Sequence, residues 1–197
     1  MVLTTALGTT LLLLVFGSEL LGPPAERLNL DGEGNLAALF STALLAAAAA
    51  SALLLSGALN GAQRGAHLAA AVMALVLAAM ALDEWRVLHE RLEGLGGLSW
   101  TYWYAPIPLT AMVAGVVVSR VLDRRARCYL GLGFIAWVAA AGIETFLWGP
   151  GPLFQDPRTM PIEETLEMLA AISIAAGLLR GAAQWQRRQG ALVPSRP

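Results

Sequence analysis

Long apolar stretches, separated by short polar or turn-forming segments, make up most of this chain. A helix that crosses a membrane needs about 20 mainly apolar residues. Six stretches meet or approach that length, at residues 2–21, 36–57, 67–82, 104–122, 129–148 and 161–179. The pattern predicts an all-α fold, a polytopic transmembrane helix bundle of about six spans that forms a single integral membrane domain over residues 1–197.

Turn-forming residues support these divisions. Gly22-Pro23-Pro24 follows the first stretch, Asn60-Gly61 separates the second from the third, and Gly149-Pro150-Gly151-Pro152 follows the fifth. Proline lacks the N–H that a helix interior needs but suits a first helical turn, as at Pro106 and Pro161. The third stretch is short, but its helical pattern continues to residue 92, before glycines at 94, 96 and 97. We therefore expect that helix to extend beyond the apolar core of the membrane.

The first stretch has no Lys or Arg before it, so the charged segment that opens a secretory signal is missing. We expect it to be retained as the first span. Small residues are dense in several stretches, and the pair Gly177 and Gly181 permits close approach between helices. The same density also fits an alanine-rich composition, so the sequence does not assign these glycines to a dimer interface.

Arginine predicts the orientation. With six spans, nine of the 13 basic residues, all of them Arg, fall on one side and four on the other. The positive-inside rule then places both termini in the cytoplasm. The absence of Lys, with abundant Ala and Gly, is typical of a high-GC bacterium, so we expect the protein in the bacterial cytoplasmic (inner) membrane, with the lipid bilayer as its first partner.

Composition excludes several classes of protein. At 57% hydrophobic and 14% charged residues, the chain is too apolar for an ordinary soluble domain, in which about a quarter of residues are charged. The net charge is −1, and no basic patch of the kind that binds nucleic acid is present, so no nucleic-acid partner is expected. Cys128 is the only cysteine, which excludes an intrachain disulfide.

Carboxylates are the least expected feature of these stretches. Under the predicted topology, 13 of the 14 carboxylates lie toward the outer side, and only Asp123 lies toward the cytoplasm. Several of them sit inside or at the end of an apolar run, where a charge costs a few kcal/mol, so such residues are usually paired, hydrated or functional. Glu144 has no basic neighbour within a helical turn, and Arg86 is our first candidate for its partner.

Carboxylates and an imidazole on neighbouring helices are what a divalent cation site in a helix bundle requires. The candidate metal ligands come from the third, fifth and sixth spans, and are Asp83, Glu84, His89, Glu144, Glu164 and Glu167. The cofactor expected from this set is a divalent metal ion of unspecified identity.

Two other interpretations of these carboxylates remain. Crowded acids raise one another's pKa, so a site that shares or relays protons fits equally well. A structural role fits too, because Asp83 and Glu90 are placed to pair with Arg86 along one helix, and Glu163 and Glu164 suit the positive end of a helix dipole. His67 and His89 lie 22 positions apart on one predicted helix, too far to ligate one haem together.

The patterns Asp83-Glu84-x4-His89-Glu90 and Glu163-Glu164-x2-Glu167-Met168, with a lone Glu144 between them, resemble a group of uncharacterised bacterial multi-pass membrane proteins. The resemblance covers about residues 67–180. It implies a helical membrane protein and no established activity. The several histidines of the alkaline ceramidases and related membrane hydrolases are missing.

These observations lead to two hypotheses of function. The first is a multi-pass membrane protein whose outward-facing carboxylate and histidine cluster binds a divalent cation or relays protons. The second is an accessory structural subunit that packs against the subunits of a larger membrane complex. A transporter is less favoured, because no span is plainly interrupted at its midplane. The residues alone do not decide whether the protein is an enzyme.

Overall fold

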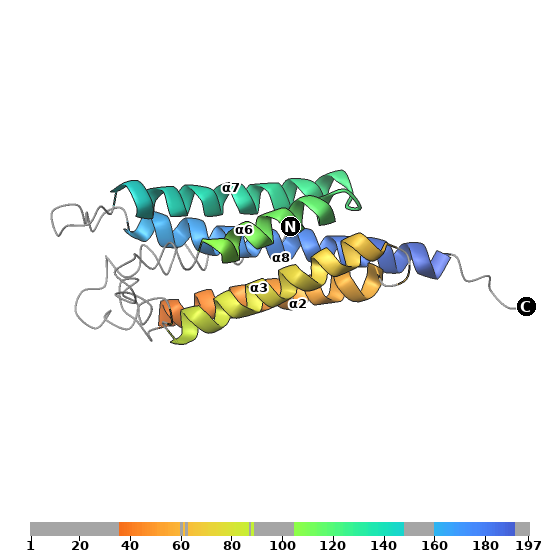
Figure 1. Cartoon of the computed structure of the whole chain (residues 1–197), viewed down its shortest axis with the longest axis horizontal. Coiled ribbons are helices and arrows are strands. Elements are labelled where there is room, and N and C mark those ends of the chain that lie inside the picture. Colours follow the sequence, from red (N-terminus) through yellow and green to blue (C-terminus); the bar gives the residue numbers. More distant parts are fainter. Residues whose placement is uncertain are drawn as a thin grey trace, which may run out of the picture.

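The computed structural model describes residues 36–59, 61, 63–86, 88, 105–147 and 160–191, except for the side chains at 36, 37, 144–147, 160 and 161. This part of the chain consists of helices and the turns between them. The helices are α2 (Leu36–Leu59), α3 (Arg64–Arg86), α6 (Pro106–Ser119), α7 (Arg124–Leu147) and α8 (Met160–Ala191). All five run along the long axis of the molecule (Figure 1).

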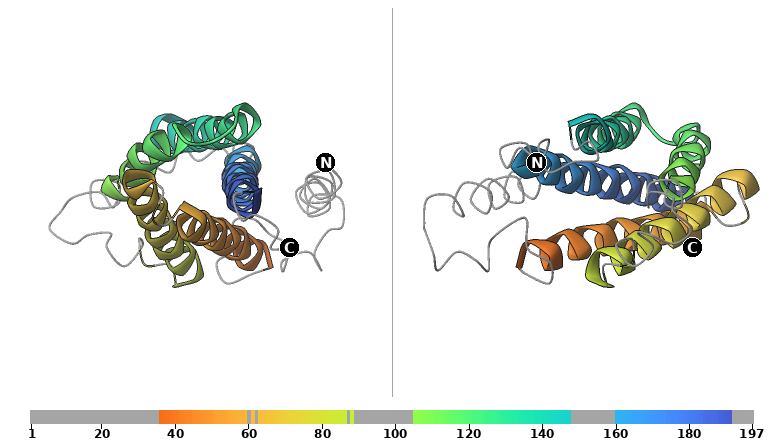
Figure 2. Two further views of the ribbon diagram at one scale, coloured as in Figure 1. Left: turned by 90° about the vertical axis from the view of Figure 1, so that its right-hand side faces the viewer. Right: turned by 60° about the vertical axis from the view of Figure 1, so that its left-hand side comes forward.

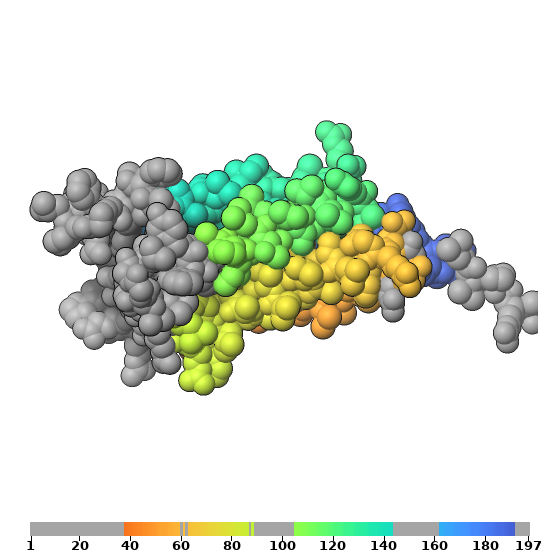
Figure 3. Space-filling model, in the orientation of Figure 1, coloured from red at the N-terminus to blue at the C-terminus, as the bar shows by residue number. Residues whose placement is uncertain are grey.

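The described helices follow one another around the bundle. Seen along the long axis, their order is α2, α3, α6, α7 and α8, with α8 returning to the side of α2 (Figure 2). The closest packing joins α2 to α3, α7 to α8 and α2 to α8, whereas α6 packs on α3 and touches α7 only sparsely. In the space-filling view, α3 and α6 lie side by side on the near face (Figure 3).

Five of the six predicted spans coincide with a described helix, and the first, at residues 2–21, lies outside the described residues. By length and composition, four of the described helices could cross a membrane, over Ala38–Leu59, Arg64–Arg86, Arg124–Ile143 and Ile162–Ala191. The fifth, α6, is apolar but has only 14 residues, about 21 Å at 1.5 Å per residue. The described residues therefore support a helical membrane protein with four long spans, and the predicted count of six is not established.

Helix boundaries differ from the apolar stretches where polar residues continue a helix. α7 begins at Arg124, before the predicted start at 129, and α8 continues to Ala191, well past the predicted end at 179. Arginine, glutamine and alanine are good helix formers, so hydropathy marks the membrane-compatible part of these helices and not their ends. α6 ends earlier than predicted because the N–H groups of Arg120, Val121 and Leu122 bond to carbonyls three residues back, which tightens the chain into a turn.

Burial in this bundle favours small side chains. The buried positions of α3 include Ala66, Ala69, Ala70, Met73 and Leu77, the spacing of one helical face. Large apolar side chains point outward instead, as in Leu75 at 72% exposed and Ile135 at 67% exposed. Membrane helices pack closely through small residues and present large apolar ones to lipid. The pattern of burial thus agrees with the hydropathy in indicating a membrane protein.

Glycines hold α7 against α8. A Cβ at Gly177 would lie 2.9 Å from the Ala126 carbonyl oxygen and 3.0 Å from the Leu130 nitrogen. On α7, a Cβ at Gly133 would lie 2.9 Å from the carbonyl oxygen of Ala170 in α8. The two backbones therefore approach too closely for any side chain larger than hydrogen at these positions. Gly181 likewise faces Leu122 and Leu55, so the Gly177–Gly181 pair serves packing within one chain.

The α2–α3 hairpin closes at the turn that the sequence predicts. Gly61 has φ of +80° there, a conformation that favours glycine. His67 of α3 then bonds back to α2, with Nδ1 2.9 Å from the carbonyl oxygen of Ser56 and 3.0 Å from its hydroxyl. The Ser56 hydroxyl donates to the carbonyl oxygen of His67 at 3.1 Å. His67 thus joins the two helices.

Candidate functional site

The fold brings the predicted site residues of three helices to one end of the bundle. The C-terminal ends of α3 and α7 and the N-terminal ends of α2, α6 and α8 lie together, at the left of Figure 1. We call this the carboxylate end, and its described helices carry Asp83, Glu84, Glu144, Glu163, Glu164 and Glu167. The described ends of α3, α7 and α8 that carry these acids thus lie at the same end of the bundle.

On α3, the two candidate ligands differ in environment. Asp83 is buried, with 8% of its surface exposed, and Glu84 is half-buried. Neighbouring Trp85 and Arg86 are exposed, and the Arg86 guanidinium stacks over the Trp85 ring at 4.8 Å from its centroid. A carboxylate buried in the last turn of an apolar helix is held there by interactions with other groups.

On α8, Glu163, Glu164 and Glu167 are all half-buried. Glu163 lies in its first turn, where the helix dipole favours negative charge, and Glu164 and Glu167 lie in the second turn. The next turn, at Met168, packs against Leu44 of α2 together with Ala171 and Ile172. The first turns of α8 are therefore level with the first turns of α2.

The matching part of α2 carries two hydroxyls. Ser41 is 5% exposed, and the Thr42 Oγ1 is buried without a hydrogen-bond partner among the described residues. Both lie within one helical turn of Leu44 toward the carboxylate end, near the level of Glu167. A buried hydroxyl without a partner costs about 1–3 kcal/mol, so Thr42 marks an unusual polar position on the α2 side.

Glu144 enters the same end on α7. The contacts of Gly133 with Ala170 and of Gly177 with Ala126 define an antiparallel register between α7 and α8. Continued toward the carboxylate end, this register places the Glu144 backbone about level with Met160, one turn from Glu163 and Glu164. The side chain of Glu144 lies outside the described residues, so its predicted pairing with Arg86 stays a prediction.

The carboxylates form an arc over neighbouring helices. α7 packs on α8, α8 on α2, and α2 on α3, so the acids of α3 and those of α8 are separated by α2 and its hydroxyls. Within the described residues, no group of three His, Cys, Asp or Glu side chains is placed to hold a metal ion. His89 lies outside the described residues, so the predicted six-residue ligand set stays a prediction. Chemically, the arc offers oxygen ligands and exchangeable protons.

At the opposite end, the structure reveals a polar network that the sequence analysis did not predict. Asp123 precedes α7, and its Oδ1 accepts the N–H of Ala126 at 2.8 Å, the geometry of a helix N-cap. Arg180 of α8 donates through Nε to both carboxylate oxygens at 3.0 and 3.1 Å and forms an ion pair with Oδ2 at 2.9 Å. This hydrogen-bonded guanidinium holds the pKa of Asp123 below its usual value, with help from the Ala126 N–H.

Further hydrogen bonds join α8 to its neighbours at this end. The Gln184 side chain accepts the Asp123 N–H at 3.0 Å, the Trp185 indole donates to Val121 at 3.2 Å, and Gln189 donates to the Ala58 carbonyl at 2.7 Å. The sequence contained one sign of this polar network, because Asp123 is the one acid that the predicted topology places among the arginines of that side.

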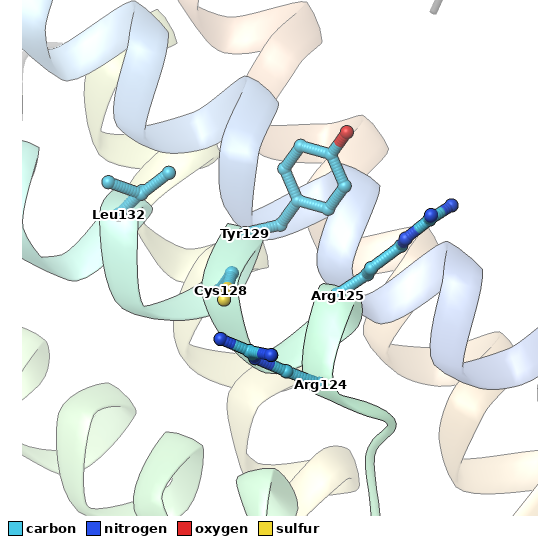
Figure 4. Close-up of a pocket in the computed structure, with 5 residues that line it drawn as sticks. All are labelled: Arg124, Arg125, Cys128, Tyr129 and Leu132. Atoms are coloured by element: carbon cyan, nitrogen blue, oxygen red, sulfur yellow. The ribbon is translucent and has the colours of Figure 1, made fainter.

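A surface hollow of about 420 Å³ lies beside the start of α7 and is lined by Arg124, Arg125, Cys128, Tyr129 and Leu132. All five side chains project from the first turns of this helix (Figure 4). Arg124 extends on the side of Cys128, and Arg125 extends on the side of Tyr129 (Figure 4). The hollow is remote from the carboxylate end, because it lies at the opposite end of α7.

Comparison with known proteins identifies the family but not the activity. The chain belongs to a family described as a domain of unknown function, DUF8692, whose model matches residues 2–181. No curated protein and no solved structure matches the chain.

Proposed function

We propose that this member of the family is a multi-pass protein of the bacterial cytoplasmic membrane that binds cations, either protons or a divalent metal ion, at its carboxylate end. The observation that supports this function best is Asp83, a carboxylate buried at 8% exposure in the last turn of an apolar helix. It lies at the same end as three half-buried glutamates of α8. Acids kept at such positions are functional candidates because burial costs free energy.

The arc of side chains supports the proton form more directly than the metal form. The described part of the chain brings no three ligands together, whereas proton exchange needs only carboxylates and hydroxyls spaced along a hydrated surface. The metal form requires that His89 or the Glu144 carboxylate join Glu164 and Glu167, which would give the mixed oxygen and imidazole set of a transition-metal site.

The orientation belongs to the same proposal. We place the carboxylate end at the outer face and the arginine-bearing turns in the cytoplasm, which the positive-inside rule supports. Both termini would then be cytoplasmic, provided that residues 2–21 form the first span.

The test is cation binding by the full chain in detergent or nanodiscs. Calorimetric titration with Mn²⁺ or Zn²⁺, together with metal analysis of the purified protein, tests whether the site binds a metal ion. The number of protons taken up between pH 5 and pH 8 tests whether it binds protons. We expect Asp83→Asn and Glu167→Gln each to remove about one titrating group or to weaken metal binding by about tenfold. Asp123→Asn at the opposite end is the matched control.

Two results would contradict the proposal. The metal form fails if the purified protein, with or without Glu144→Gln, holds negligible metal and shows no heat of binding. The proton form fails if the proton uptake of Asp83→Asn and Glu167→Gln equals that of the unmodified chain over the whole range.

The accessory-subunit hypothesis stays a separate proposal. It predicts small-residue faces that a partner could cover, yet Gly133, Gly177 and Gly181 contact their own chain. Stoichiometric copurification of other membrane subunits with the full chain would favour it, and a stable isolated monomer would count against it.

A further inference from the structure

The end of the bundle opposite the carboxylates is strongly basic. Its described arginines are Arg64, Arg120, Arg124, Arg125, Arg127, Arg180, Arg187 and Arg188, and we call it the arginine end. The one described carboxylate there, Asp123, is bonded to Arg180. The remaining guanidinium groups therefore give this end a net positive charge that no described acid balances.

The hollow at the start of α7 has a graded lining. Arg124 and Arg125 are exposed at its outer edge, and neither forms an ion pair with a described carboxylate. Cys128 and Tyr129 follow one turn along the helix, and Leu132 follows after another turn, at 58% exposed. The lining thus changes from cationic to apolar over about 12 Å, at 1.5 Å per residue.

That order matches the structure of a phospholipid at a membrane surface. Guanidinium groups bind phosphate oxygens in a bidentate manner, and a tyrosine hydroxyl donates one further hydrogen bond. Beyond Leu132 the outer face of α7 continues as Ile135 and Val138, both more than half exposed, which is a suitable surface for an acyl chain. Basic pockets between membrane helices bind anionic headgroups, and here the basic and apolar side chains come from the single helix α7.

The α7 N-terminus itself does not supply the anion site. Asp123 already caps it by accepting the Ala126 N–H, so a bound phosphate would be held by side chains. Arg124 and Arg125 are the cationic side chains that line the hollow, so their replacement should weaken the binding of an anion there.

We propose that the hollow formed by Arg124, Arg125, Tyr129 and Leu132 binds an anionic phospholipid, with its phosphate at the arginine-bearing edge and an acyl chain along Leu132. The exposed apolar surface of α7 beyond Leu132, at Ile135 and Val138, favours a lipid over free phosphate. Free phosphate has no apolar part to place on that surface.

The test uses the full chain and phosphatidylglycerol as the probe. Native mass spectrometry in a neutral detergent compares the binding of phosphatidylglycerol with that of phosphatidylcholine. We expect a clear preference for the anionic lipid, and a loss of about fivefold in affinity for each arginine replaced in Arg124→Gln/Arg125→Gln. The matched control is Arg187→Gln/Arg188→Gln, which removes the same charge from the same end outside the hollow.

Cys128 provides an independent readout because it is exposed in the hollow and is the only cysteine. In nanodiscs, phosphatidylglycerol should slow maleimide labelling of Cys128 in the unmodified chain by severalfold, and much less in Arg124→Gln/Arg125→Gln. Elution volume and circular dichroism check that each variant is folded, and Leu132→Gln provides a second variant that keeps both arginines and should also bind the lipid more weakly.

Three outcomes would overturn the proposal. Equal losses in the two double variants would mean a general attraction of the arginine end to anionic surfaces. Displacement of the lipid by excess inorganic phosphate, with phosphate alone protecting Cys128 from maleimide as well as the lipid does, would mean a free-phosphate site. Equal binding of the two lipids would mean no anion site. Because Asp83→Asn should leave lipid binding unchanged, a failure here is separate from a failure of the cation proposal.

Discussion

At the start of α7, Asp123 accepts hydrogen bonds from Ala126 and Arg180, and its backbone N–H donates to Gln184. One residue therefore caps a helix and ties the α6–α7 turn to α8. Its position among arginines was visible in the sequence, but its partner was not, because Arg180 lies 57 residues away. Pairing at that separation depends on how α8 packs.

The Asp123–Arg180 pair predicts a pH dependence of stability. The folded-state pKa of Asp123 is lowered, so its contribution is fully present above the unfolded-state value of about 4 and is lost as pH falls through the lower folded-state value. We expect Asp123→Asn to lower the melting temperature of the detergent-solubilised chain at pH 7, and the difference from the unmodified chain to shrink below pH 4.

The control for this prediction is Arg180→Gln, alone and with Asp123→Asn. If the pair acts as one unit, the double variant should melt close to the single variants at pH 7. A difference between Asp123→Asn and the unmodified chain that stays constant from pH 7 to pH 3 would contradict the proposed cause.

At the scale of the helix, α7 and α8 are held at a distance that only glycine permits. A Cβ at Gly177 would meet backbone atoms of Ala126 and Leu130, which cannot move independently of the whole helix. The sequence showed that Gly177 and Gly181 were suited to close packing, but not which surface they would meet. The antiparallel register of α7 and α8 decided that.

This packing predicts that Gly177→Val destabilises the folded chain by about 1–3 kcal/mol, the usual cost of overpacking a close contact. The matched control is Gly131→Ala on α7, because nothing lies within 4 Å of a Cβ there and alanine is the better helix former. Thermal or denaturant unfolding in one detergent measures both. Equal stability of Gly177→Val and the unmodified chain would show that the helices are not in close contact.

At the scale of the whole molecule, charge separates the two ends of the bundle. The described acids lie at the carboxylate end except for Asp123, and the described arginines lie at the arginine end except for Arg86. An arrangement with one basic end is what the positive-inside rule associates with the cytoplasmic face. The distribution of charge over the described residues thus predicts that the arginine end faces the cytoplasm.

The native cysteine can test this orientation. We expect a membrane-impermeant maleimide to leave Cys128 unlabelled in intact cells and to label it once the membrane is permeabilised. In a Cys128→Ser background, Ile162→Cys at the carboxylate end should behave oppositely, since Ile162 is 55% exposed. Labelling of Cys128 from outside would reverse the proposed orientation and remove the outward-facing site.

The sequence by itself determined the helical class, the membrane-compatible stretches and the end of the bundle at which Asp83, Glu144 and Glu167 lie. Hydropathy can be read from each stretch of the sequence alone. The direction of each helix then follows from counting the spans, because successive spans run in opposite directions. Only the tertiary structure decided that α2 separates the acids of α3 from those of α8, that Gly177 packs on α7, and that Asp123 binds Arg180. Such contacts depend on the rotation and register of each helix against its neighbours, which arise from close packing over the whole bundle. The sequence therefore marked Gly177 and Asp123 as unusual residues but did not specify their partners.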